Sequence, residues 1–125
     1  MSPAYQIGSI CEAFDAACEQ FESLIGELHG ERTAQMEHGE IETLISLMGT
    51  ELMRLLLQAH LQIRAMRELR RHDISGTDGE ALLHCRSGCT RDLMTLFGEV
   101  VVRRKGYSSR GKESLFPLDG ELNLD

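Results

Sequence analysis

The chain has 125 residues, of which 42% are hydrophobic, and it contains only four phenylalanines, two tyrosines and no tryptophan. This length suits one domain, and apolar bulk that comes mainly from Leu, Ile and Met favours packing between helices. There is no run of about 20 apolar residues and no basic stretch leading into an apolar segment. These features argue against a membrane-spanning helix and a secretion signal, so we expect a soluble, cytoplasmic protein.

The charge is unevenly distributed, although the net charge of −7 alone argues against a nucleic-acid-binding protein. Residues 1–63 contain ten acidic side chains and only two basic ones, Arg32 and Arg54. Residues 64–112 contain eleven basic and six acidic side chains. The first part should therefore repel phosphate, whereas the second part could attract it.

Residues 1–79 are predicted to form a long, acidic, antiparallel helical hairpin. Apolar or small residues recur at helical spacing from Ile7 to Leu28, with Ser2 and Pro3 as a cap and Gly30 as a stop. Cys11 and Cys18 fall on this apolar stripe, so we expect reduced thiols in a helical core.

A second helix of about thirty residues is predicted from steps of four and three between Ile41 and Leu69. Further leucines widen its apolar surface, so one partner helix would leave part of it in water. We expect either a dimer or a β-element packed against this surface. Gly49 inside the pattern is a candidate point of close helix contact.

Residues 80–125 are predicted to form a small basic β-element that packs with the helices as one domain. A turn-rich stretch, residues 72–79, ends the second helix. Residues 93–97 and 99–107 have strand composition, and residues 113–118 can return as a third strand. The expected fold class is therefore α+β, with an antiparallel β-hairpin or a three-stranded sheet after the helices.

The patterns that would mark a metal or catalytic site are weak. His84, Cys85 and Cys89 lie within six residues, but Cys-x3-Cys is looser than the usual zinc spacing, and His72 would have to be brought close by the fold. No spacing selects a two-metal triad among the available acids, which are Asp73, Asp78, Glu80, Asp92, Glu99 and Asp119. We therefore predict no metal, no cofactor and no catalytic residue.

Basic residues form two clusters that suit phosphate binding. Arg64, Arg67 and Arg71 lie within about 60° of one another on an ideal helix. Alternation along a strand puts Arg103, Lys105 and Tyr107 on one face, and Arg110 follows in the turn. Such residues can hold phosphates and stack on a base. They can equally form a solvated face or pair with the acidic helices, and both interpretations remain open.

The runs Asp92–Tyr107 and Ser114–Leu124 resemble the N-terminal region of ISKra4-family insertion-sequence transposases. The shared features are the Asp78–Gly79 turn, the strand containing Thr-Leu-Phe-Gly-Glu-Val, a Tyr and the Pro-Leu-Asp segment. The resemblance implies that a two-metal catalytic domain follows Asp125, so that this chain is not an enzyme by itself. It further implies an accessory role in homodimerisation and in binding the DNA ends of the element.

Two other functions fit the same sequence. The acidic helices suggest a free-standing module derived from a transposase, which binds the basic surface of another protein. Such a module could inhibit a nucleic-acid-handling complex, as anti-CRISPR proteins do by placing carboxylates where phosphates would lie. A purely structural oligomerisation domain is the third possibility.

Overall fold

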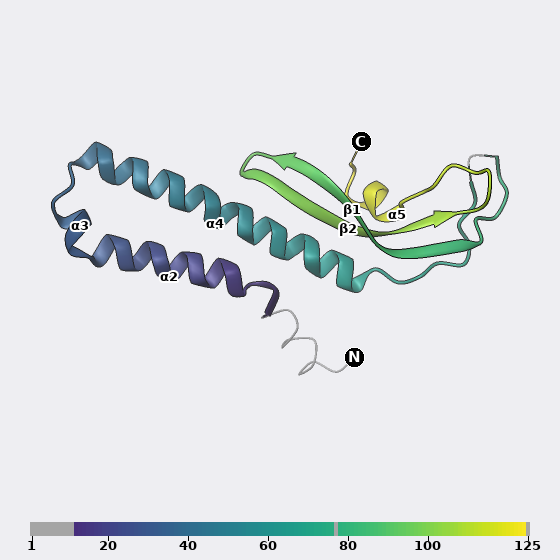
Figure 1. Cartoon of the computed structure of the whole chain (residues 1–125), viewed down its shortest axis with the longest axis horizontal. Coiled ribbons are helices and arrows are strands. Elements are labelled where there is room, and N and C mark those ends of the chain that lie inside the picture. The colour runs from purple at the N-terminus through teal and green to yellow at the C-terminus, as the bar shows by residue number, and fades with distance from the viewer. Residues whose placement is uncertain (1–11, 77, 125) are drawn as a thin grey trace.

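The computed structural model describes residues 12–76 and 78–124. Helices α2 and α4 lie side by side and antiparallel, joined by α3, and a long β1–β2 hairpin lies along the second half of α4 (Figure 1). Helix α5 follows the hairpin near the C-terminus. The predicted α+β fold, helices first and an antiparallel sheet second, is confirmed.

The helices are α2, Asp15–His29, α3, Glu31–Ala34, and α4, His38–Arg67. A capping box between Glu37 and Glu40 starts α4, which has the predicted length of 30 residues. A helix of this length spans about 45 Å. The predicted start of the first helix at Ser2 and Pro3 lies outside the described residues.

Helix α2 packs against the first half of α4 along a narrow line of contact. Ala17 and Leu24 are buried there, and the Gln20 side-chain amide donates a hydrogen bond of 3.1 Å to the Met48 carbonyl. The prediction that Cys18 belongs to the helical core is wrong, because its side chain is exposed. Within α4 the buried residues all lie in the second half, and they are Ala59, Leu61 and Ile63.

The sheet has two antiparallel strands, β1, His84–Thr95, and β2, Gly98–Ser108. A β-bulge between Arg86 and Cys89 interrupts their register, and Gly88 in the bulge has a φ of +73°. Strand β1 begins well before the predicted start at residue 93. The stretch 84–92 contains few β-branched residues, and its pairing with β2 makes it a strand.

The third strand, which was one of two predicted outcomes, does not form among the described residues. The returning segment makes one isolated bridge, between Leu115 and Tyr107, before α5, Pro117–Glu121, begins. Pro117 has no N–H for a sheet ladder, and its fixed φ suits the first position of a helix. A short helix therefore replaces the end of the expected strand.

Two small cores hold the β-element. In the first, Val100 and Val102 of β2 pack against Leu61 of α4, with the flanking leucines Leu57, Leu93, Leu122 and Leu124. In the second, Tyr107 packs against Ile74 and Leu82. The β-element thus covers part of the wide apolar surface of α4, as one of the two alternatives predicted. In residues 12–76 and 78–124, no helix has the length and apolar character needed to cross a bilayer.

Candidate functional site

Helix α4 covers the outer edge of β2 with polar side chains. The Gln58 amide group donates to the Val101 carbonyl and accepts from the Val101 N–H, both at 2.8 Å. Arg54 donates to the Glu99 carbonyl at 3.4 Å, and the Lys105 N–H donates at 2.7 Å to Glu68, which directly follows α4. These bonds satisfy backbone groups that an edge strand would otherwise offer to another chain.

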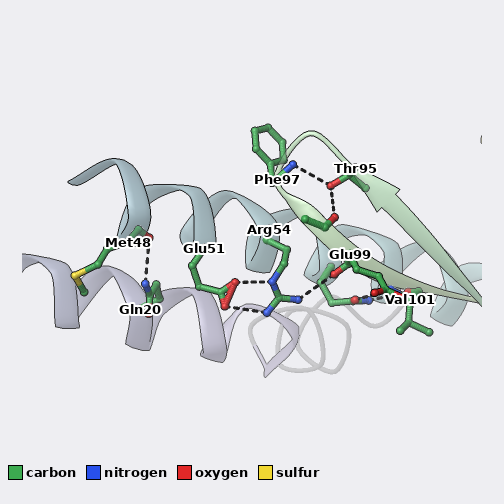
Figure 2. Close-up of polar contacts among 10 residues, drawn as sticks. Gln20, Met48, Glu51, Arg54, Thr95, Phe97, Glu99 and Val101 are labelled. Atoms are coloured by element: carbon green, nitrogen blue, oxygen red, sulfur yellow. Dashed lines mark hydrogen bonds and ion pairs between the residues drawn. The ribbon is translucent and has the colours of Figure 1, made fainter. Parts of the chain in front are cut away.

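Arg54 is held in place for this contact by Glu51, one turn earlier on α4. Figure 2 shows the guanidinium group between the Glu51 carboxylate and the Glu99 backbone. The hydrogen bond from Arg54 lowers the pKa of Glu51 below its ordinary value of 4.5. The side chain of Arg54 also lies close to Gly98, where a Cβ atom would come within 3.2 Å of it.

An open groove of about 540 Å³ lies between the second half of α4 and β2. We call it the α4–β2 groove. The predicted residues Arg103 and Lys105 line it together with Gln62 and Met66 of α4. Arg103 is exposed, and the Lys105 ammonium group donates to the Ser87 hydroxyl at 3.3 Å. Glu12 and Glu68 also line the groove, so its charge is mixed.

The other predicted DNA-contacting residues lie elsewhere. Arg64, half-buried, and Arg67, exposed, are on α4 but outside the lining of the groove. Arg71 follows α4 and pairs with Asp73 at 3.1 Å. Arg110 is exposed in the turn after β2. The structure therefore joins Arg103 with Lys105 and does not gather all the predicted residues into one surface.

The prediction that Tyr107 stacks on a base is wrong, because Tyr107 is only 1% exposed. Its hydroxyl accepts a hydrogen bond of 2.7 Å from the Arg71 N–H, and burial raises its pKa above the ordinary value of 10.0. Strand alternation puts Tyr107 on the predicted face, but the bridge to Leu115 brings a further segment beside it. The sequence pattern alone could not reveal that cover.

Many of the remaining charged side chains form ion pairs within the chain. Asp119 accepts from Arg104 at 3.0 Å and from Arg91 at 3.3 Å, and the Arg104 guanidinium lies 4.0 Å from the Phe116 ring centre. Sequence reasoning did not identify this cluster. The acids considered for catalysis include several that pair in this way, namely Asp73, Asp78, Glu80 and Asp119.

The two cysteines of β1 cannot act as a metal-binding pair. Cys85 lies opposite Tyr107 and Cys89 lies opposite Arg104, and these two β2 residues face opposite sides of the sheet. His72, His84 and Cys85 do line one cavity of about 100 Å³. Among residues 12–76 and 78–124, however, no group of three His, Cys, Asp or Glu side chains could hold a metal ion.

The helical hairpin leaves an apolar face exposed. Phe21, Ile25 and Ile45 are 52%, 51% and 42% exposed. An apolar groove of about 400 Å³ lies between the helices. The face, as its helical spacing places it, consists of Phe14, Cys18, Phe21 and Ile25 beside α4 residues Ile45, Leu52 and Leu56. Glu22 also lines this groove, whereas Asp15, Glu19 and Glu27 of α2 lie further round that helix.

Comparison of the chain with protein-family models, with curated proteins and with solved structures finds no match.

Proposed function

We propose that the chain is the non-catalytic N-terminal module of a DNA transposase, which self-associates through its helical hairpin and binds DNA ends through its β-element. The observation that carries this proposal is the apolar face of α2 and α4. The resemblance of residues 92–124 to transposase N-terminal regions supplies the biological setting. The basic residues of the β-element supply the DNA contact.

Self-association follows from the cost of leaving this face in water. Phe21, Ile25 and Leu56 are between 38% and 52% exposed, on two helices that bury little against each other. Burying one such side chain completely contributes about 1.5–3 kcal/mol. Patches of this kind on a protein surface mark interaction sites. A second copy of the chain offers the same face and would cover it symmetrically.

DNA binding is supported by the position of Arg103 and Lys105. Their side chains come from one strand and line a groove that is open to solvent. An arginine and a lysine two residues apart on a strand can contact neighbouring phosphates. Because Tyr107 is buried, we assign DNA recognition to the phosphate backbone, without stacking on a base.

The self-association is tested by light scattering on the protein and on the variant Phe21→Glu with Leu56→Glu. We expect a dimer for the unchanged chain and a monomer for the variant, because two carboxylates would have to be buried in the interface. Leu96→Glu is the matched control, since Leu96 is 95% exposed at the tip of the β-hairpin. Circular dichroism checks that the helices persist. A monomeric unchanged chain at all accessible concentrations would contradict the proposal.

An acidic protein-binding module is a second candidate function, and one observation favours it. Both basic residues of the first 63 are already paired, Arg32 with Glu27 at 2.9 Å and Arg54 with Glu51. Most carboxylates of the helical hairpin therefore stay uncompensated and could meet a basic partner protein. A strict monomer that binds no DNA at low salt, yet binds a basic protein in a salt-sensitive way, would favour this function.

A further inference from the structure

One stripe of α4 has an unusual distribution of charge. Taking steps of four and three along the helix, it contains Glu42, Ile45, Gly49, Met53, Leu56, His60, Arg64 and Arg67. At 100° per residue this stripe lies roughly 100° from Met48, which faces α2, and roughly 180° from Gln58, which faces β2. The stripe is therefore directed away from the sheet. We call it the α4 stripe.

The α4 stripe is acidic at one end, apolar in the middle and basic at the other end. Ile45, Met53 and Leu56 supply the apolar middle, and each is about two-fifths exposed. At the acidic end, Glu42 contacts His38 of its own helix at 2.6 Å, and both side chains are exposed. At the basic end, among the described residues, Arg64 and Arg67 take part in no ion pair.

Gly49 adds a place for close approach at the middle of the stripe. A Cβ atom at this position would meet nothing within 4 Å, so the prediction of close helix contact is not met within the described part of one chain. A glycine in a helix interior costs about 1 kcal/mol relative to alanine. A second helix that packs here would make use of the missing side chain.

We propose that α4 pairs with α4 of a second copy, antiparallel, about a two-fold axis at Met53. The inference rests on the proposed self-association and specifies its geometry. Glu42 and Arg64 are equally far from Met53 along the helix, at roughly 16 Å each. The two-fold axis therefore places Glu42 opposite the partner subunit's Arg64, and this pairing occurs twice.

The adjoining groove between the helices completes the interface. Its lining includes Phe14, Phe21, Leu52 and Leu56, with Glu22 as its one charged residue, and it opens on the side of α4 that carries the stripe. Two hairpins that meet over these surfaces form a bundle of four helices, in which apolar side chains face a shared core. Met53 lies at the centre, where it meets its own copy.

Charge complementarity selects this arrangement over its competitors. A parallel pair would place Glu42 beside the partner's Glu42 and the arginines beside the partner's arginines. Duplex DNA would meet apolar side chains and a carboxylate over most of the stripe. Arg64 and Arg67 thus serve a protein contact, and DNA binding is left to Arg103 and Lys105.

Disulfide cross-linking tests the position of the two-fold axis. Met53→Cys should form a covalent dimer under mild oxidation, because the two introduced thiols would lie within bonding reach. Leu47→Cys is the matched control, since Leu47 lies on another side of α4 and is 68% exposed. The unchanged chain reports any cross-linking by the native cysteines. Equal cross-linking of the two variants would overturn the proposed axis.

Charge reversal tests the pairing itself by analytical ultracentrifugation. Glu42→Arg and Arg64→Glu should each raise the dimer dissociation constant about tenfold, and the double variant should restore it. Glu19→Arg, on the far side of α2, is the control and should leave the constant unchanged. If the chain is a dimer but the double variant does not restore the dissociation constant and Met53→Cys does not cross-link, the α4 pairing is overturned and self-association stands.

If the unchanged chain is a monomer, both proposals are overturned. If only added duplex DNA protects Met53→Cys from alkylation, the α4 stripe binds DNA.

Discussion

A single carboxylate, Asp119, anchors the C-terminal segment to the sheet. It lies between Arg91 and Arg104, and Arg104 is only 9% exposed and covered by Phe116. Removing one partner from such a cluster leaves the opposite charge desolvated without compensation. The cluster therefore matters more through the penalty of breaking it than through the strength of each ion pair.

We predict that Asp119→Asn lowers the free energy of unfolding by about 3 kcal/mol, because both arginines lose their charged partner. Urea denaturation followed by circular dichroism measures this change. Asp92→Asn is the control, since Asp92 is exposed on β1. A loss for Asp119→Asn no larger than that for the control would show that the two guanidinium groups are adequately solvated.

The paired carboxylates predict a loss of stability in acid. Hydrogen bonds from Arg54, Arg71 and Lys112 lower the pKa values of Glu51, Asp73 and Asp78, respectively. A carboxyl group with a lowered folded-state pKa stabilises the fold above its unfolded pKa, and that contribution disappears as the pH falls through the folded-state pKa.

We therefore expect the free energy of unfolding to decrease as the pH falls below 4.5, the ordinary value for Glu51. Glu51→Gln should make this dependence shallower, whereas Glu19→Gln, an exposed carboxylate on α2, should not. Denaturation midpoints between pH 3 and pH 6, taken at about one pH unit apart, compare the slopes. Parallel slopes for Glu51→Gln and the unchanged chain would count against the contribution of the Glu51–Arg54 pair.

At the scale of elements, α4 acts on β2 as a neighbouring strand would. Gln58 presents one donor and one acceptor to Val101, which is the pattern that a paired strand supplies. Leu115 does the same for Tyr107 further along the strand. The outer edge of β2 is thus occupied at both places without a third strand.

Gln58→Ala should therefore destabilise the fold by about 1–3 kcal/mol, since a half-buried N–H and carbonyl would lose their partners. Amide hydrogen exchange at Val101 should accelerate more than at Val102, because Val102 pairs with Arg91 of β1 and does not contact Gln58. Gln62→Ala, one turn further along α4, is the control. Unchanged exchange at Val101 would mean that water replaces the glutamine without cost.

The sequence predicted the elements whose signal is local and missed those that depend on a distant partner. Helix α4 has its own apolar periodicity, so its length could be predicted directly. The first half of β1 is a strand because β2 lies beside it, and its residues carry no such signal. Tyr107 alternates with Lys105 as expected, but the chain that folds back over it through Leu115 leaves no mark in the alternation.

At the scale of the whole molecule, the charge asymmetry of the sequence separates the acidic helical hairpin from the more basic β-element. It did not show which cations are already paired. Arg104 looked equivalent to Arg103 in a run of basic residues, yet one is buried against Asp119 and the other is exposed. Opposite faces of one strand give the two neighbours different surroundings.

Arg103→Ala with Lys105→Ala should weaken duplex DNA binding equally for all sequences and reduce the salt dependence of affinity. Each lost phosphate contact reduces the slope of log affinity against log salt by about 1. Fluorescence anisotropy between low and physiological salt measures the slope. Arg32→Ala, a paired cation of the helical hairpin, is the control. No binding of the unchanged chain at low salt would remove DNA from the proposed function.

The contact between Gln58 and Val101 also shows that a helix can match the residue spacing of a neighbouring strand over only a short length. Four helical residues advance about 6.0 Å, whereas two strand residues advance about 6.6 to 6.8 Å. The two spacings are similar enough for Arg54 to contact Glu99 and for Gln58 to contact Val101. The difference between them adds up with each further step along the helix and the strand. Gln62, the next in the series, lines the α4–β2 groove beside Arg103. The matched series is thus interrupted at Arg103, where the groove lies, and the edge of β2 is met again at Lys105 by Glu68, which follows α4.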